Sequence, residues 1–367
     1  MPINRHLFHI SDISLTQFRN YGSKAFSFPK RVIGLCGNNG IGKTNLLDAI
    51  YYLCFTRSYF SRTDAGSVQT GSQGFRLEGN WNQQGREHKT VCILRETGKK
   101  ELWVDQELCP KFSAHIGRFP VVFIAPDDII LITGGAEERR RFIDTLLSQL
   151  FPEYLKILIR YNKILQERNG FLRRAAESNH IDTGLLEILD MQLSESGTLI
   201  FDERRKFMDS FLPEVQHFYA AITSSAEKPV VAYISPLLER SFPDLLMQNR
   251  SRDLAMQRTS SGIHRDDLEL KLNEESFKNI ASQGQRKSLL FALKLAEFNV
   301  LKKAKGFPPL LLLDDIFEKL DETRMQNLLH WVCRENTGQV FLTDTHCSRI
   351  RDVMEKIEVD CQLIELT

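Results

Sequence analysis

The chain has 367 residues, which is long enough to bury a large core and, by the usual sizes of domains, to form about two domains. Its 48 lysines and arginines against 47 acidic residues leave a net charge of +1. This balance excludes a global attraction to nucleic acid or membrane, so any such surface must be a local patch. No apolar run approaches the ~18 residues of a membrane helix, and residues 1–7 do not resemble a signal peptide. We therefore expect a cytoplasmic protein without membrane contact.

The seven cysteines are an odd number and contain no C-x-x-C pair. This usage is typical of scattered, buried thiols in a reducing compartment, and it disfavours a disulfide framework or a zinc site.

The first elements in chain order are short strands, expected at residues 7–15 and 24–28 and again at 31–36. The third of these leads into a glycine-rich stretch, and an apolar-faced helix is expected directly after it, at residues 45–53.

The glycine-rich stretch fits G-x-x-x-x-G-K-[ST], the phosphate loop, and consists of Gly37, Asn38, Asn39, Gly40, Ile41, Gly42, Lys43 and Thr44. Its glycines allow tight or left-handed backbone, so that several N–H groups face inward and form an anion nest. Lys43 would contact the β- and γ-phosphates, and Thr44 would bind Mg²⁺. The strand before and the helix after the loop favour this interpretation, which predicts ATP with Mg²⁺ as cofactors.

Polar-alternating strands follow at residues 75–81, 88–96 and 101–104, which predicts an antiparallel sheet with one solvated face. An apolar strand at 121–124 ends at Pro126, and strand signals then nearly vanish until residue 225. Apolar residues recur there at helical spacing, which predicts a helical hairpin or small bundle whose first long helix has at most about 25 residues. Strands return at 230–234 and 268–272.

Three further segments complete a second half of the predicted site. Ser282 and Gly284 open a helix, where a serine N-cap and a small residue suit phosphate binding. An apolar strand at 309–313 ends in Asp314 and Asp315, followed by Leu320-Asp321. Another strand at 339–343 ends at Thr345-His346.

These elements occur in the order of the ABC-type ATPases, which the chain resembles. The resemblance implies that Asp314 orders the Mg²⁺ water shell and that Asp315 polarises the attacking water. It also implies nucleotide contacts for Arg19 and Asp321. His346 either contacts the γ-phosphate or is a loop residue without a role in the site. Because the chain has one phosphate loop and one Ser282 helix start, two complete sites predict a head-to-tail homodimer that holds two ATP molecules.

The predicted fold class is α/β: an ABC-type ATPase head with a mixed β-sheet plus a helical arm (lid) domain. Residues 1–126 and 226–367 are assigned to the head, and residues 127–225 to the arm.

Within the ABC-type ATPases the chain resembles the RecF family along most of its length. The stretches that carry the resemblance are residues 15–21 (LTQFRNY), 125–128 (APDD), 139–144 (RRRFID), 166–169 (QERN), 262–267 (GIHRDD), 281–286 (ASQGQR) and 313–315 (LDD). Two features depart from the expected pattern. Ile263 stands where the family usually has Pro. Asp127 and Asp128 stand in the segment where the wider superfamily has a glutamine that senses the γ-phosphate, called here the glutamine lever.

The resemblance implies an ATP-dependent DNA-binding protein of recombinational repair, with slow DNA-dependent ATP hydrolysis. It would bind double-stranded DNA and gap junctions, and it would act with RecO-like and RecR-like proteins to load a RecA-like recombinase during replication and the SOS response. The alternatives are an ABC transporter ATPase subunit, which should carry the glutamine lever, another short-armed SMC-like ATPase, and a P-loop kinase, which has no use for the Ser282 helix start. An arm of about 100 residues disfavours the long coiled coils of chromosome-organising relatives.

Three basic clusters are candidates for the DNA surface: Arg139, Arg140 and Arg141; Arg168 with Arg173 and Arg174; and Lys302, Lys303 and Lys305. Charge runs are usually solvated helix faces, so each cluster competes with that simpler interpretation. Nothing in the sequence resembles a helix that reads the major groove, which predicts phosphate contacts and binding largely independent of DNA sequence.

Overall fold

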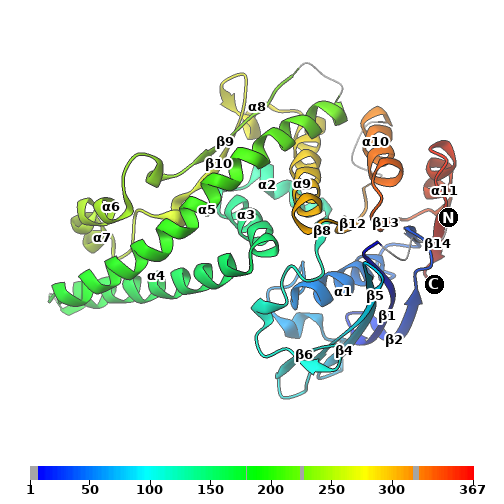
Figure 1. Ribbon diagram of the computed structural model, residues 1–367, viewed down its shortest axis with the longest axis horizontal. Helices are drawn as coiled ribbons and strands as arrows, with labels where there is room; N and C mark the ends of the chain where they lie inside the picture. Colours follow the sequence, from blue (N-terminus) through cyan, green and yellow to red (C-terminus); the bar gives the residue numbers. More distant parts are fainter. Residues whose placement is uncertain (1–6, 179, 224–226, 317–321) are drawn as a thin grey trace. The chain divides into compact units, whose positions relative to one another are not determined.

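The computed structural model describes residues 7–178, 180–223, 227–316 and 322–367. The chain forms two compact units (Figure 1). The head unit comprises Met1–Asp128, His217–Ala226 and Gln283–Thr367, and the arm unit comprises Ile129–Gln216 and Glu227–Ser282.

The units divide the chain differently from the predicted domains, which assigned all of 226–367 to the head. Residues 227–282 belong to the arm unit because their strands form a small sheet of their own that packs on an arm helix. Conversely, residues 217–226 belong to the head unit. Local sequence patterns predicted these strands but did not reveal which unit they join.

The head unit contains an antiparallel sheet in the order β2-β1-β4-β5-β6-β7. Its strands are β1 His9–Phe18, β2 Tyr21–Ser27, β4 Phe75–Gln83, β5 Arg86–Leu94, β6 Lys100–Val104 and β7 Glu107–Leu108. Buried and exposed side chains alternate along β4, as expected for a sheet with one solvated face. Two 3₁₀ turns accompany this sheet, η1 Asp64–Ser67 and η2 Phe112–Ala114.

A second head sheet is parallel throughout, in the order β14-β3-β13-β12-β8. Its strands are β3 Val32–Cys36, β8 Val121–Ile124, β12 Leu310–Leu313, β13 Val340–Asp344 and β14 Cys361–Glu365. Apart from β14, these strands are buried along their whole length, which explains their continuous apolar runs. Because parallel strands share a carboxyl edge, the segments that follow β3, β12 and β13 meet at one edge of the sheet.

Helix α1, Lys43–Phe55, packs against strands of both head sheets. Eleven of its thirteen residues are buried, so it is apolar on nearly every side. The other head helices are α9 Gln283–Lys305, α10 Glu322–Leu329, the π-helical turn His330–Glu335 and α11 Cys347–Lys356. The turn η3, Pro126–Ile129, lies where the chain leaves the head unit.

The arm unit is mainly helical, with the sheet β11-β10-β9 beside its helices. Its elements are α2 Ile130–Thr133, α3 Ala136–Leu150, α4 Pro152–Ser178, α5 Thr183–Thr223, β9 Val230–Ile234, η4 Pro236–Leu238, α6 Phe242–Gln248, α7 Arg250–Met256, η5 Ile263–Arg265, β10 Asp267–Leu272, β11 Glu275–Ser276 and α8 Phe277–Ile280. The predicted helical character is confirmed, but α4 has 27 residues, slightly more than expected. The last residues of α5 belong to the head unit. None of the helices in the described ranges has the length and apolar character needed to cross a bilayer.

A buried ionic network holds the arm unit together. Arg204 of α5 is 1% exposed and donates to Asp144 at 2.7 Å, to Asp266 at 2.6 Å and to the hydroxyl of Tyr154 at 3.0 Å. Tyr233 of β9 also donates to Asp266. Loss of either carboxylate would leave the buried guanidinium charge only partly compensated, which is costly. Asp266 of the stretch 262–267 (GIHRDD) therefore has a structural role in the arm unit.

The expected pattern of scattered thiols holds for five of the seven cysteines: Cys54, Cys92, Cys109, Cys333 and Cys361 are free. Cys36 and Cys347 depart from it, because they form a disulfide. The two partners are 311 residues apart in sequence. They meet because Cys36, at the end of β3, pairs with Asp344 of β13, and Cys347 follows Asp344 by three residues. Cysteine spacing carries no information about strand pairing.

A cluster of buried charges in the head unit joins Asp128, where the chain leaves this unit, to helix α9. Lys294 of α9 lies 3.6 Å from Asp128 and 3.7 Å from Glu297, and its ammonium donates to Tyr59 at 3.3 Å. Burial raises the pKa of Glu297 to about 7, with Lys294 opposing and Asp128 assisting the shift. Two carboxylates therefore share one lysine in a site nearly closed to water.

This pKa predicts how stability changes with pH. The native pKa of Glu297 is raised, so the folded protein binds the proton more tightly, and stability is lost as pH rises from about 4.5 to about 7. Glu297→Gln removes this penalty, which is on the order of 3 kcal/mol at most. We expect the variant to raise the unfolding midpoint more at pH 8 than at pH 5. The exposed Glu137→Gln is the control, and an equal effect of Glu297→Gln at both pH values would contradict the prediction.

Candidate functional site

The predicted phosphate loop lies between β3 and α1, so the strand and helix required on either side are confirmed. Gly37, Gly40 and Gly42 have φ values of 141°, 81° and 120°, which side chains rarely adopt. At Gly37 a Cβ atom would also lie 2.6 Å from the carbonyl oxygen of Leu366. The positions of these glycines are therefore required by the backbone.

Lys43 is the first residue of α1 and is 8% exposed. Its ammonium donates to the carbonyls of Gly37 at 2.5 Å and Asn38 at 3.0 Å, which holds the positive charge against the loop. Loop N–H groups, the helix N-terminus and this ammonium together favour a bound anion.

The hydroxyl of Thr44 lies 2.9 Å and 3.0 Å from the two carboxylate oxygens of Asp314. Asp314 follows β12 and is 6% exposed; burial raises the pKa of its carboxyl, while hydrogen bonds from Thr343 and Thr44 oppose the shift. A hydroxyl and a carboxylate at this distance form an oxygen donor set of the kind that Mg²⁺ prefers. The residues present therefore fit the predicted metal.

Thr343 completes this arrangement and was not identified from the sequence. Its hydroxyl donates to Asp314 at 2.8 Å and accepts from the N–H of Asp315 at 2.8 Å. Asp315 itself has a left-handed backbone, with φ of 48°. Thr343 lies near the end of β13, next to β12, so its place follows from strand pairing and has no motif to mark it.

Arg19 lies in the turn between β1 and β2, and its guanidinium binds within the head. It donates to the fully buried Asp48 of α1 at 2.9 Å, to Ser58 at 2.8 Å and to the carbonyl of Gly66 at 2.7 Å. Its predicted contact with nucleotide stays a prediction.

The other predicted site residues are His346, Ser282, Gly284 and Asp321. His346 is exposed, and its N–H donates to Asp344 at 2.7 Å. Ser282 is the last residue of the arm unit, whereas Gly284 lies in the first turn of α9 in the head unit. Asp321 lies outside the described residues. Roles for these four residues stay predictions.

The first candidate DNA cluster lies on α3 and is largely engaged within the arm unit. Arg139 donates to both oxygens of Asp267 at 2.6 Å and 2.9 Å, and Arg140 donates to the carbonyl of Asp266 at 2.7 Å. Arg141 is exposed but pairs with acidic residues one turn earlier on the same helix. These partners weaken the case for this cluster as a phosphate-binding surface.

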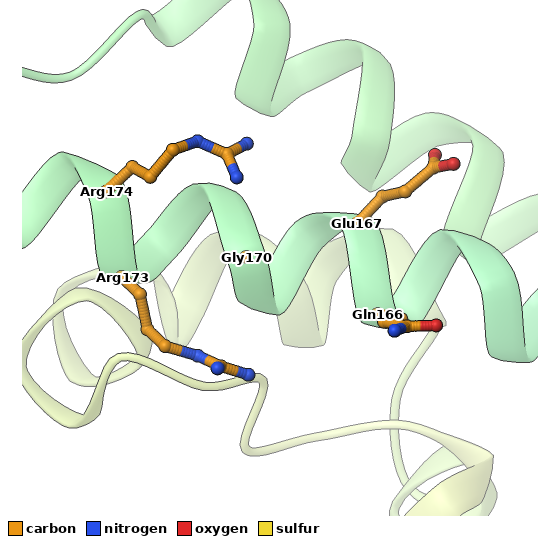
Figure 2. Close-up of a pocket in the computed structure, with 5 residues that line it drawn as sticks. All are labelled: Gln166, Glu167, Gly170, Arg173 and Arg174. Carbon is orange, nitrogen blue, oxygen red and sulfur yellow. The ribbon is translucent and has the colours of Figure 1, made fainter.

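The second cluster divides between the interior and the surface. Arg168 is fully buried and pairs with Asp190 at 2.6 Å and Asp253 at 2.8 Å, so the folded arm does not present it to DNA. Arg173 and Arg174 are exposed and, with Gln166, Glu167 and Gly170, line an open hollow of about 380 Å³ on α4. Figure 2 shows their guanidinium groups directed to different sides of the helix.

The third cluster lies in the last turns of α9. Lys303 is exposed, while Lys302 and Lys305 are partly buried, and burial lowers the pKa of Lys305.

Comparison with known proteins first defines the class. The mixed α/β head, with a phosphate loop facing a carboxylate after an apolar strand, is that of SMC-type ATPase heads. Residues 9–362 match the family model described as RecF/RecN/SMC N terminal domain. An Smc head bound to the C-winged helix domain of ScpA superposes with a TM-score of 0.56 over 97% of this chain and 93% of that one, at 15% identity.

More similar proteins define the family. The DNA replication and repair protein RecF of Flavobacterium johnsoniae is 39% identical over 98% of this chain and 100% of its own length. RecF of Cytophaga hutchinsonii is also 39% identical, over 93% of this chain and 90% of its own. A solved structure of the recombination mediator protein RecF-ATPrS in the RecFOR pathway is 28% identical, with a TM-score of 0.87 over 98% of this chain and 96% of that one. The chain belongs to the RecF family.

The contacts of Thr343 predict a separable effect on catalysis. Thr343→Val keeps the side-chain shape but removes both hydrogen bonds to the paired acids, which cost about 1 kcal/mol each. We expect ATP hydrolysis to fall roughly tenfold or more while ATP affinity changes little, since the phosphate loop is untouched. Steady-state hydrolysis and calorimetry measure the two effects. Thr343→Ser retains the hydroxyl and serves as the matched control; equal losses in both variants would contradict the role of the hydroxyl.

Proposed function

We propose that this chain is an ATP-dependent DNA-binding protein of recombinational repair. It dimerises on ATP, binds DNA at gaps and junctions, and helps to load a RecA-like recombinase with RecO-like and RecR-like partners. One observation carries the nucleotide part of the proposal: the Thr44 hydroxyl meets the Asp314 carboxylate beside a phosphate loop that Lys43 closes. Membership of the RecF family supports the repair part, and solved RecF structures are described as ATP-bound and as members of the RecFOR pathway.

Nucleotide binding follows from the charges at the loop. The N–H groups of residues 37–44 and the ammonium of Lys43 would bind the β- and γ-phosphates, and Thr44 and Asp314 would hold Mg²⁺. When bound there, Mg²⁺ would supply positive charge opposite the transferred phosphoryl group.

Hydrolysis requires a group that orients water. Asp315 has this role in the proposal, because it follows Asp314 directly and its backbone is held by Thr343. The head unit contains one phosphate loop and one α9 start, so a second copy of the chain completes each site with its Ser282 and Gly284. ATP thereby links two chains, and the dimer is the species that binds DNA.

Asp315→Asn tests this composite site. The amide cannot act as a base, so hydrolysis should fall about a hundredfold while ATP still binds. Dimers should then accumulate with ATP, as measured by light scattering. Lys43→Ala, which removes the positive charge facing the phosphates, should bind no ATP and remain monomeric. An Asp315→Asn protein that is equally monomeric with and without ATP would refute the dimer model.

The DNA surface is expected among basic residues that the fold leaves exposed. Arg173 and Arg174 meet this criterion on α4, whereas Arg168 is buried. Contacts with phosphates alone make binding independent of base composition and strongly dependent on salt.

We expect DNA affinity to rise with ATP, to fall steeply with salt and to change little with base composition. The double variant Arg173→Ala with Arg174→Ala should weaken binding about tenfold at moderate salt and lower the salt slope, because two phosphate contacts are lost. Arg205→Ala with Lys206→Ala removes two adjacent exposed cations of α5 and is the matched control. Fluorescence anisotropy on gapped duplexes measures both. Unaltered affinity on adding ATP, with the dimer confirmed, would refute the coupling.

A further inference from the structure

The carbonyl groups of the phosphate loop need hydrogen-bond donors. A loop that turns its N–H groups toward an anion turns its carbonyls the other way, and these carbonyls need donors of their own. In the head unit, the carbonyl of Ile41 accepts from Asn20, in the turn between β1 and β2, and the carbonyl of Gly42 accepts from Tyr21, the first residue of β2.

The hydrogen bonds have short, well-defined geometry. The Asn20 side-chain amide donates to the Ile41 carbonyl at 2.8 Å, and its oxygen accepts from Asn45 of α1 at 2.8 Å. The Ile41 carbonyl can only accept, which fixes the orientation of the Asn20 amide. The Tyr21 hydroxyl donates to the Gly42 carbonyl at 3.0 Å, and the same carbonyl accepts the N–H of Leu46 at 2.9 Å at the start of α1.

The turn lies directly against the loop. A Cβ atom at Gly42 would lie 2.7 Å from the Asn20 amide nitrogen and 2.8 Å from the Tyr21 hydroxyl. Gly42 also has a φ of 120°. The third glycine of the motif is therefore required both by its own backbone and by the approach of these two side chains.

The turn is itself held firmly, so it can act as a fixed support. Phe18 pairs with Tyr21 across two residues, and the intervening Arg19 has a φ of 54°. The Arg19 guanidinium binds the fully buried Asp48 of α1. The Tyr21 ring is 8% exposed, and burial raises the pKa of Tyr21 to about 12, so its hydroxyl remains a donor at neutral pH.

We propose that Asn20 and Tyr21 are positioning residues of the nucleotide site. They hold the Ile41 and Gly42 carbonyls away from the nucleotide and thereby direct the N–H groups of the loop toward its phosphates. This inference rests on the nucleotide binding proposed above. It adds a role for the last residues of the RecF-like stretch 15–21, where the sequence singled out only Arg19.

The test compares ATP with pyrophosphate, which reports on the phosphate site alone. Tyr21→Phe removes one hydroxyl and keeps the ring, and Asn20→Ala removes the amide. Each variant should bind ATP and pyrophosphate between about threefold and tenfold more weakly, by the same factor for both ligands, in calorimetry. The unfolding midpoint without ligand should stay within about two degrees of the wild-type value. Tyr52→Phe and Asn80→Ala, whose hydrogen bonds to Asp64 and Asp12 lie elsewhere in the head unit, are the controls.

The outcomes separate the two proposals. If Lys43→Ala binds ATP as the wild type does, the proposed nucleotide site fails, and the positioning role fails with it. If Lys43→Ala loses ATP while Tyr21→Phe and Asn20→Ala bind both ligands normally, only the positioning role is overturned. Weakened ATP binding with unchanged pyrophosphate binding also overturns it. Should Tyr21→Phe not fold, the exposed Asn20 decides the question alone.

Discussion

The contact between Thr44 and Asp314 depends on the whole parallel sheet of the head. The two residues are 270 positions apart, and each follows a different strand. They meet because β3 and β12 flank β13 with all three strands parallel, so their carboxyl ends share one edge. Thr343, near the end of the middle strand, then contacts both paired acids. The site is thus a consequence of strand order, and α1, which carries Lys43 and Thr44, packs against both head sheets.

The fold uses its charged residues unequally. In the arm unit, Arg204 and Arg168 are buried against carboxylates and specify how helices and strands pack. Arg139 is held by Asp267 in the same way. Sequence clusters of arginine therefore overstate the basic surface, because a guanidinium surrounded by acceptors contributes to internal packing and presents little charge to solvent.

The phosphate loop is supported from two sides. Helix α1 begins at Lys43 and supplies the helix N-terminus, while Asn20 and Tyr21 supply donors to two carbonyls of the loop. The turn between β1 and β2 reaches Asp48 on α1 through Arg19. Loop, helix and turn are thus joined by hydrogen bonds, of which the one from Tyr21 to the Gly42 carbonyl is buried and those of Asn20 are exposed.

The sequence by itself determined the phosphate loop, the strands before it and after it, the apolar strand with its paired acids and the helical character of the arm. These features depend on local chemistry: glycine at positive φ, apolar periodicity, and acids at a strand end. Tertiary structure alone decided that residues 227–282 join the arm, that Thr343 contacts Asp314, that Cys36 meets Cys347, and that Arg168 is buried. Each of these depends on which distant segments become neighbours, and pairing between strands or helices far apart in sequence leaves no periodicity or spacing to read.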